Sequence, residues 1–134
     1  MKPIHIFKSG QHTAMGGGSF DFSESDLAAT VKAYDPTLHE APLVIGHPKH
    51  DAPAGGWVKS LSLADHGLVA EPQQVDADFA ELVAKGKFKK ISASFYQPDA
   101  ANNPVPGVYY LRHVGFLGAQ PPAVKGLRPV DLAE

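Results

Sequence analysis

Two serines and two histidines in this sequence are of the types that form a hydroxyl nucleophile and its base. Ser92 and Ser94 alternate with apolar residues, His47 follows the apolar run Leu43-Val44-Ile45, and His113 lies inside another apolar run. A serine hydroxyl becomes a good nucleophile when a histidine within hydrogen-bond reach takes its proton, and a third group that holds the histidine tautomer improves the base. One serine and two histidines would meet this requirement.

The two serines are not distinguished by their spacing. In an extended strand Ser92 and Ser94 project to one face, and Ile91, Ala93 and Phe95 project to the other. A structural interpretation competes with the catalytic one, because strand serines often face solvent and a histidine in an apolar strand is often a hydrogen-bonded structural residue. The other histidines, at positions 5, 12, 39 and 66, are expected to be mostly solvated.

A metal site is the second chemistry that the histidines suggest. His47, His50 and Asp51 lie close enough in sequence to contact one ion. However, Pro48 and the loop setting remove the regular helical spacing of zinc-hydrolase motifs, and no glutamate follows in the position of the general base. We therefore expect neither a metal nor another cofactor, and we keep the histidine metal site as an alternative.

Composition excludes several classes of function. The chain has 134 residues, no cysteine, 12 Lys and Arg and 14 Asp and Glu, for a formal charge of −2. This length is typical of one domain, and the lack of cysteine excludes disulfides, thiolate zinc sites and a cysteine nucleophile. Without a lysine-rich stripe we expect no nucleic-acid partner, and without an apolar run of roughly 18 residues we expect no membrane span.

Short strands and two helices are predicted to position these residues. Ser23 is a helix N-cap with Asp26 at the matching position, and the helix should end before Pro36. A second helix should begin at Asp76, bury Phe79, Leu82 and Val83 on one face, and end at Gly86. The expected strands are 2–7, 43–45, 55–63, 67–71, 88–96 and 108–117, with a loop over 9–19. This pattern predicts an α+β fold or a barrel with flanking helices.

Four stretches of the chain closely resemble the Mu-like prophage I protein, a phage capsid maturation protease. They are Leu43-Val44-Ile45-Gly46-His47-Pro48, Gly56-Trp57-Val58, Phe88-Lys89-Lys90-Ile91-Ser92-Ala93-Ser94-Phe95-Tyr96 and Tyr110-Leu111-Arg112-His113-Val114-Gly115-Phe116-Leu117-Gly118-Ala119-Gln120-Pro121-Pro122-Ala123. Such proteins are similar to tailed-phage prohead proteases and to herpesvirus assemblins, which are serine peptidases. The resemblance implies a small, mostly antiparallel β-barrel flanked by helices.

The resemblance also implies roles for individual residues. Ser92 matches the nucleophile, Ser94 the accompanying small position, His47 the general base and His113 the third member of a Ser-His-His triad. A neutral third histidine stabilises an imidazolium less than a carboxylate does, so slow turnover is expected. The oxyanion candidates are the backbone amides of Gly118, Ala119 and Gln120, because the two prolines that follow offer no amide.

The biological setting is implied in the same way. Residues 1–134 would be a single protease domain, and the C-terminal scaffolding region of a longer precursor would be absent from this sequence. The expected activity is cleavage of the internal scaffold and of the protease itself during procapsid maturation, inside the assembling procapsid in the host bacterial cytoplasm. The expected partners are the phage scaffolding protein and the major capsid protein, with homo-oligomerisation also possible. The alternative is a non-enzymatic capsid scaffold or shell-binding module.

Overall fold

Strands dominate the computed structural model, which describes residues 2–13, 19–46, 51–65 and 67–118. The strands are β1 (Ile4–Lys8), β2 (Gly10–Thr13), β3 (Ser19–Phe22), β4 (Pro42–Ile45), β5 (Gly56–Ala64), β6 (Gly67–Gln73), β7 (Lys90–Tyr96) and β8 (Tyr110–Leu117). The helices are α1 (Glu24–Ala33) and α2 (Ala77–Ala84). Neither of these helices has the length and apolar character needed to cross a bilayer.

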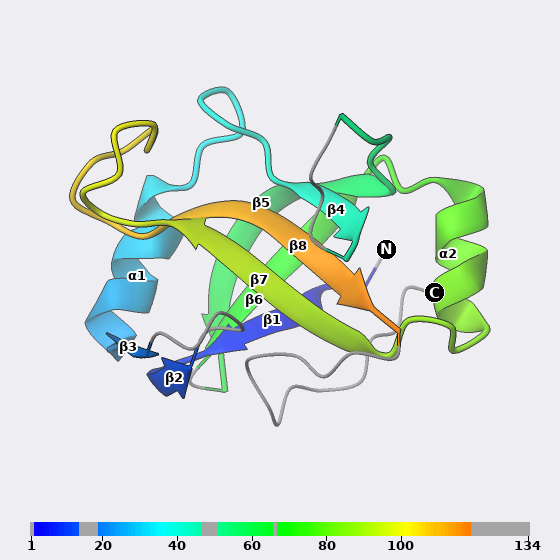
Figure 1. Cartoon of the computed structure of the whole chain (residues 1–134), viewed down its shortest axis with the longest axis horizontal. Helices are drawn as coiled ribbons and strands as arrows, with labels where there is room; N and C mark the ends of the chain where they lie inside the picture. Colours follow the sequence, from blue (N-terminus) through cyan, green and yellow to red (C-terminus); the bar gives the residue numbers. More distant parts are fainter. Residues whose placement is uncertain (1, 14–18, 47–50, 66, 119–134) are drawn as a thin grey trace.

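Six of the strands form one sheet in the order β1-β6-β5-β4-β8-β7. The pairings in this sheet are antiparallel except for β4 and β8, which run parallel. The sheet curls until β1 approaches β7, and α1 and α2 lie at opposite sides of the resulting barrel (Figure 1). This nearly closed barrel confirms the predicted fold class.

The barrel interior is filled by alternate residues of its strands. Ile4 and Ile6 of β1, Leu43 of β4, and Val114 and Phe116 of β8 are nearly inaccessible to solvent. An aromatic cluster fills the gap between the two end strands of the sheet: the ring of Phe7 on β1 lies 4.6 Å from that of Phe22 and 4.9 Å from that of Phe95 on β7. Apolar burial therefore connects strands that do not share a hydrogen-bonded ladder.

Helix α1 begins as the sequence predicts. The Ser23 hydroxyl accepts a hydrogen bond from the Asp26 amide at 3.0 Å, and the Asp26 carboxylate accepts one from the Ser23 amide at 2.9 Å. This capping box satisfies two amides that have no partner within the helix. The helix ends at Ala33, with Tyr34 as its C-cap, just before Pro36.

Two expectations about local structure were wrong. The expected loop over 9–19 contains β2 and the first residue of β3, which pair antiparallel, and this strand pair places Phe22 in the core. Leu82 is 37% exposed, whereas Phe79 and Val83 are each 5% exposed. Phe79 and Val83 are four residues apart and therefore lie nearly in line along the helix. Leu82 is turned about 100° from Val83 around the helix axis, so it lies beside the narrow buried face and not within it.

Candidate active site

Ser92, Ser94 and His113 lie on one outer face of the β7–β8 pair. In the register of these strands Ser92 is opposite Gly115 and Ser94 is opposite His113. Ile91, Ala93 and Phe95 belong to the core or pack against it, so the serines point to the other face, as the alternation predicts. Ser92 is nonetheless 6% exposed and His113 8% exposed.

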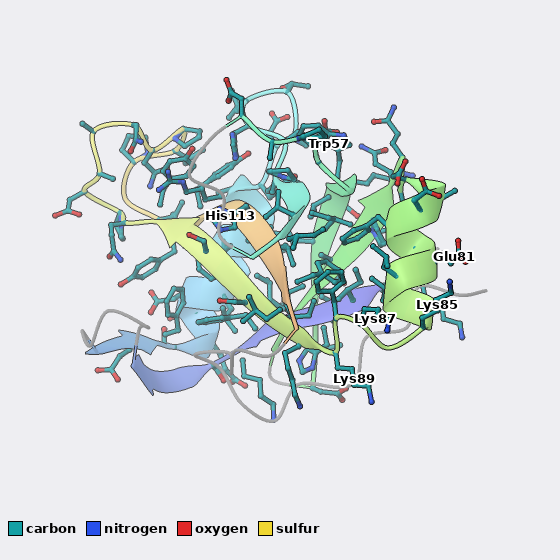
Figure 2. The ribbon with its side chains drawn as sticks, turned by 45° about the vertical axis from the view of Figure 1, so that its right-hand side comes forward. Trp57, Glu81, Lys85, Lys87, Lys89 and His113 are labelled. Atoms are coloured by element: carbon teal, nitrogen blue, oxygen red, sulfur yellow. The ribbon has the colours of Figure 1, made fainter. Side chains whose placement is uncertain are left out.

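The register sets how closely the serines approach His113, which Figure 2 labels on β8. Ser94 is the direct neighbour of His113, and Ser92 is its diagonal neighbour. Direct antiparallel neighbours have Cβ atoms about 4.5–5.5 Å apart, and diagonal neighbours lie about 7–8 Å apart, still within reach of an aromatic side chain. The sheet therefore brings both serines close to this imidazole.

Strand β4 directs the chain over this face. Val44 lies beside Gly115 in the parallel β4–β8 pair, and the Gly46 amide donates a hydrogen bond to the Phe116 carbonyl at 3.0 Å. Gly46 turns the chain with a φ of +67°, in the left-handed region that glycine adopts most readily. The strand that the sequence predicted to lead into His47 therefore ends beside the strand of His113.

Gly115 allows Gly46 to approach β8 closely because it has no side chain. A Cβ atom at position 115 would lie 2.5 Å from the Gly46 carbonyl oxygen and 3.3 Å from the Ser92 carbonyl oxygen. The positions of both neighbouring backbones thus depend on glycine here. Gly46, the residue immediately before His47, consequently lies against Gly115, which pairs with Ser92.

Several residues named from the sequence lie outside the described residues. His47 and His50 are among them, as are the oxyanion candidates Ala119 and Gln120. Gly118 is described: it is exposed directly after β8, and a Cβ there would lie 3.3 Å from the Lys87 carbonyl oxygen. The described ranges hold no group of three or more side chains that would suit a metal ion.

A bulge beside His113 was not predicted from the sequence. Arg112 is the extra residue where the register shifts between the Ser94 and Phe95 pairs. Its carbonyl oxygen lies 2.8 Å from the His39 Nε2 atom, and its guanidinium lies 5.4 Å from the centre of the Tyr96 ring. The buried His5, which is 5% exposed, contradicts the expectation of solvation for this histidine, whereas His39 is partly exposed. No local pattern could reveal the His39 contact, because its partner is 73 residues away.

Tyrosine hydroxyls anchor the segment that leads into β4. The Tyr34 hydroxyl accepts a hydrogen bond from the Ala41 amide at 2.9 Å and donates one to the Val58 carbonyl at 2.6 Å. Burial raises the pKa of Tyr34 to about 12. Burial also raises the pKa of Tyr110, whose hydroxyl donates to the Asp35 carbonyl at 2.7 Å. These bonds hold residues 35–41, and hence the start of β4, in place.

Comparison by sequence finds no family model that matches this chain and no similar curated protein. Comparison by structure finds the Kaposi's sarcoma-associated herpesvirus protease. Its complex with an allosteric inhibitor matches with a TM-score of 0.54 and 13% identity over 93% of this chain and 74% of that chain. Its complex with a dimer disruptor matches with a TM-score of 0.52 and 14% identity over 89% of this chain and 69% of that chain. The barrel described above is therefore similar in fold to the herpesvirus protease.

Proposed function

We propose that this protein is a serine endopeptidase of the Mu-like prophage I type, which cleaves the internal scaffold and itself during phage procapsid maturation. The observation that carries the proposal is the convergence at Gly115. There Gly46, the residue before His47, lies against the strand that bears His113, at the position that pairs with Ser92. The similarity in fold to a viral protease supports the same activity at a coarser level.

In the proposed reaction the His47 imidazole takes the proton of the Ser92 hydroxyl as its oxygen attacks a peptide carbonyl. The protonated imidazole then gives that proton to the leaving amine, which departs as the acyl-enzyme forms. A water molecule, deprotonated by the same base, attacks the ester and releases the acid and free Ser92. A neutral His113 would hold the His47 tautomer, and because it adds no negative charge the turnover would be slow.

The oxyanion site is proposed at the backbone amides that follow β8. Gly118, Ala119 and Gln120 are the candidates, and Gly118 is the one among the described residues. Loss of one such donor typically lowers the rate by about 10²–10³. The scaffolding protein and the major capsid protein are the proposed partners, and the inside of the assembling procapsid in the bacterial cytoplasm is the proposed location.

The nucleophile is tested by comparing Ser92→Ala with Ser94→Ala in the scaffold-bearing precursor. We expect Ser92→Ala to abolish self-cleavage and labelling by a serine-reactive fluorophosphonate, because no other group would form the acyl-enzyme. Ser94→Ala should retain substantial activity, as it removes only an accompanying small residue. Gel electrophoresis and mass spectrometry of the fragments measure both.

Other outcomes would contradict this assignment. Loss of cleavage in Ser94→Ala alone would transfer the nucleophile role to Ser94, the direct neighbour of His113. Self-cleavage at the normal rate in Ser92→Ala would exclude Ser92. Scaffold binding without cleavage in both the unmodified protein and Ser92→Ala, during complete head assembly, would support the shell-binding module instead.

A further inference from the structure

The bulge in β8 determines on which face of the sheet His113 lies. Leu111 and Val114 are both fully buried in the core, although residues three apart in a regular strand point to opposite faces. The extra residue, Arg112, makes this possible, because the register of β8 against β7 shifts at this point. Arg112 and His113 consequently both lie on the outer face, where His113 is opposite Ser94.

Without the bulge these positions are incompatible. If Val114 stayed in the core, regular alternation would place Arg112 inside the barrel and expel Leu111. If Leu111 stayed in the core, His113 itself would turn inward, away from the serines. The bulge is therefore the local distortion that allows a filled core and an outward His113 at the same time.

The His39 side chain binds the main chain at this bulge. Its Nε2 atom lies 2.8 Å from the Arg112 carbonyl oxygen, and because a carbonyl oxygen only accepts, Nε2 must carry the hydrogen. The paired residues of β4 and β8 begin at Leu43 and Val114, so Arg112 lies before that ladder. A bulge leaves its extra residue outside the regular pairing, and His39 supplies a donor for the carbonyl of this residue.

The His39 ring is itself held by the main chain and by two tyrosines. The His39 amide donates to the Asp35 carbonyl at 3.1 Å, and the His39 carbonyl accepts from the Tyr110 hydroxyl at 2.9 Å. The ring centre lies 5.4 Å from that of Tyr96 and 6.0 Å from that of Tyr110, both in edge-to-face arrangements. These contacts direct the Nε2 donor of His39 toward the bulge.

We propose that His39 is a positioning residue of the candidate active site, which holds the Arg112 bulge and thereby keeps the His113 imidazole opposite the serines. This inference rests on the proposed peptidase function. Because the His39 side chain is partly exposed, water can replace its hydrogen bond with little loss of stability, but water does not fix the position of the carbonyl. Loss of the His39 donor should therefore affect catalysis more than stability.

The experiment compares His39→Phe with His39→Gln in the scaffold-bearing precursor. Phenylalanine keeps an aromatic ring beside the tyrosines but removes the donor, whereas the glutamine amide can still donate to the Arg112 carbonyl. His39→Phe should slow self-cleavage per folded molecule by about tenfold or more, because small displacements of catalytic groups can lower rates by about 10²-fold. His39→Gln should restore most of this rate.

A spectroscopic measurement follows His113 directly. The NMR signals of the His113 ring, assigned by their loss in His113→Gln, are recorded as a function of pH in the Ser92→Ala protein, which stays uncleaved. Adding His39→Phe should shift these signals and their pH dependence, because the imidazole moves relative to its neighbours. Adding His39→Gln should leave them nearly unchanged. A merely structural role of His39 would lower stability without moving the His113 signals.

Asn103→Ala is the matched control. Asn103 is 7% exposed, and its side-chain nitrogen donates to the Gln97 carbonyl at 2.9 Å and to the Val108 carbonyl at 2.8 Å, in the loop that joins β7 and β8. The change removes the same kind of bond beside the same two strands, but away from the bulge. It should lower the free energy of unfolding and leave the rate per folded molecule and the His113 signals unaltered.

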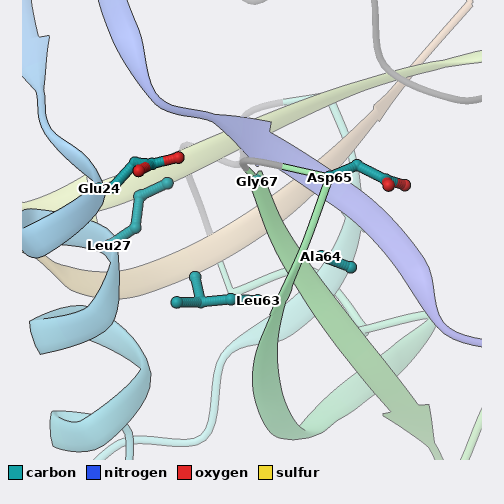
Figure 3. Close-up of a pocket in the computed structure, with 6 residues that line it drawn as sticks. All are labelled: Glu24, Leu27, Leu63, Ala64, Asp65 and Gly67. Atoms are coloured by element: carbon teal, nitrogen blue, oxygen red, sulfur yellow. The ribbon is translucent and has the colours of Figure 1, made fainter.

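Leu63→Gln is the control for a change at an exposed side chain. Leu63 is 48% exposed and lines a pocket of about 320 Å³ with Glu24, Leu27 and the β5–β6 turn (Figure 3). Because this pocket lies between α1 and the end of β5, the change should alter neither the rate of self-cleavage nor the His113 signals.

Two results would overturn the inference. One is self-cleavage in His39→Phe at the rate of the unmodified protein, and the other is an equal loss of rate in His39→Phe and His39→Gln, since glutamine retains the donor. Either result leaves Ser92-dependent self-cleavage in place, so it rejects the role of His39 alone. Self-cleavage that persists in Ser92→Ala would instead reject the proposed nucleophile, and shifted His113 signals in His39→Phe would still support the contact through the bulge.

Discussion

At the scale of single residues, the candidate site depends on a position that has no side chain. Gly115 separates Ser92 from the chain that leads to His47, and its hydrogen atom occupies the space where a methyl group would meet the Gly46 carbonyl. The serines and histidines can be identified from the sequence, but the distance between Ser92 and the chain leading to His47 is controlled by the contact between the Gly46 and Gly115 backbones. Glycine is required here by close approach, whereas at Gly46 it is required by the positive φ.

Gly115→Ala is therefore expected to reduce activity much more than the remaining fraction of folded protein would explain. The added methyl group must displace Gly46 by several tenths of an ångström or more, and small displacements of catalytic groups can lower rates by about 10²-fold. Scaffold cleavage per folded molecule measures the rate, and chemical denaturation measures the free energy of unfolding.

Gly67→Ala is the matched control for this prediction. A Cβ at position 67 would clash with the His5 ring and with the Phe7 carbonyl oxygen, both on the neighbouring strand β1 in another part of the barrel. It should lower the free energy of unfolding without changing the rate per folded molecule. Equal losses of rate in the two variants would refute the special role of Gly115.

At the scale of secondary-structure elements, the position of β4 along β8 determines whether Gly46 lies against Gly115. The Tyr34 hydroxyl bridges Ala41, just before β4, and Val58 of β5. The His39 ring contacts the Arg112 carbonyl in the bulge next to His113. The segment between α1 and β4 therefore influences both strands that meet at the candidate site.

Tyr34→Phe should lower the free energy of unfolding by about 1–3 kcal/mol, because the Ala41 amide and the Val58 carbonyl lose a buried partner. The pKa of Tyr34 is raised from 10.0 to about 12, so the native state favours the neutral hydroxyl. Its contribution is complete below pH 10 and is lost as the pH rises through about 12. Between pH 10 and 12 the free energy of unfolding of Tyr34→Phe should consequently fall less than that of the unmodified protein.

Denaturant unfolding at pH 8 and at several values between pH 10 and 12 measures this effect. Tyr109→Phe is the control, since the Tyr109 hydroxyl has no hydrogen bond within the described ranges. It should have a much smaller effect at pH 8. Identical pH profiles for Tyr34→Phe and the unmodified protein would contradict the role assigned to the Tyr34 hydroxyl.

At the scale of the whole molecule, aromatic packing closes the barrel. Phe7 of β1 is 1% exposed and contacts Phe22 and Phe95, so it joins the two ends of the sheet. The face that bears Ser92 and His113 is formed by β7 and β8, and β7 is one of these ends. Closure of the barrel therefore supports the strand that carries the candidate nucleophile.

Phe7→Ala should destabilise the protein by about 3–5 kcal/mol, the usual effect of removing a buried phenylalanine ring. For a chain of this size the midpoint of thermal unfolding should fall by roughly 10–20 °C. Circular dichroism during heating measures the change. Leu63→Ala, at a side chain that is 48% exposed, should change it little, and a similar loss in both variants would contradict the role of Phe7 in closure.

Local patterns were sufficient to predict much of this fold. The N-cap of α1, the alternation of β7 and the adjacency of β7 and β8 were all predicted and confirmed, because each depends on residues close in sequence or on strong apolar alternation. The β2–β3 pair and the exposure of Leu82 were missed, since a glycine-rich connection conceals strand pairing and a short helix buries only a narrow face. The catalytic roles of Ser92, His47 and His113 stay predictions.

The sequence by itself determined the residue types available for chemistry, the cysteine-free composition and most of the local elements. Only the tertiary structure decided that β4 runs parallel to β8 and that Gly115 lies between Gly46 and Ser92. Periodicity reports which face of an element is buried, whereas the pairing of β4 with β8 joins segments about 70 residues apart. Such pairing is selected by the packing of the complete barrel, which no local stretch of sequence contains.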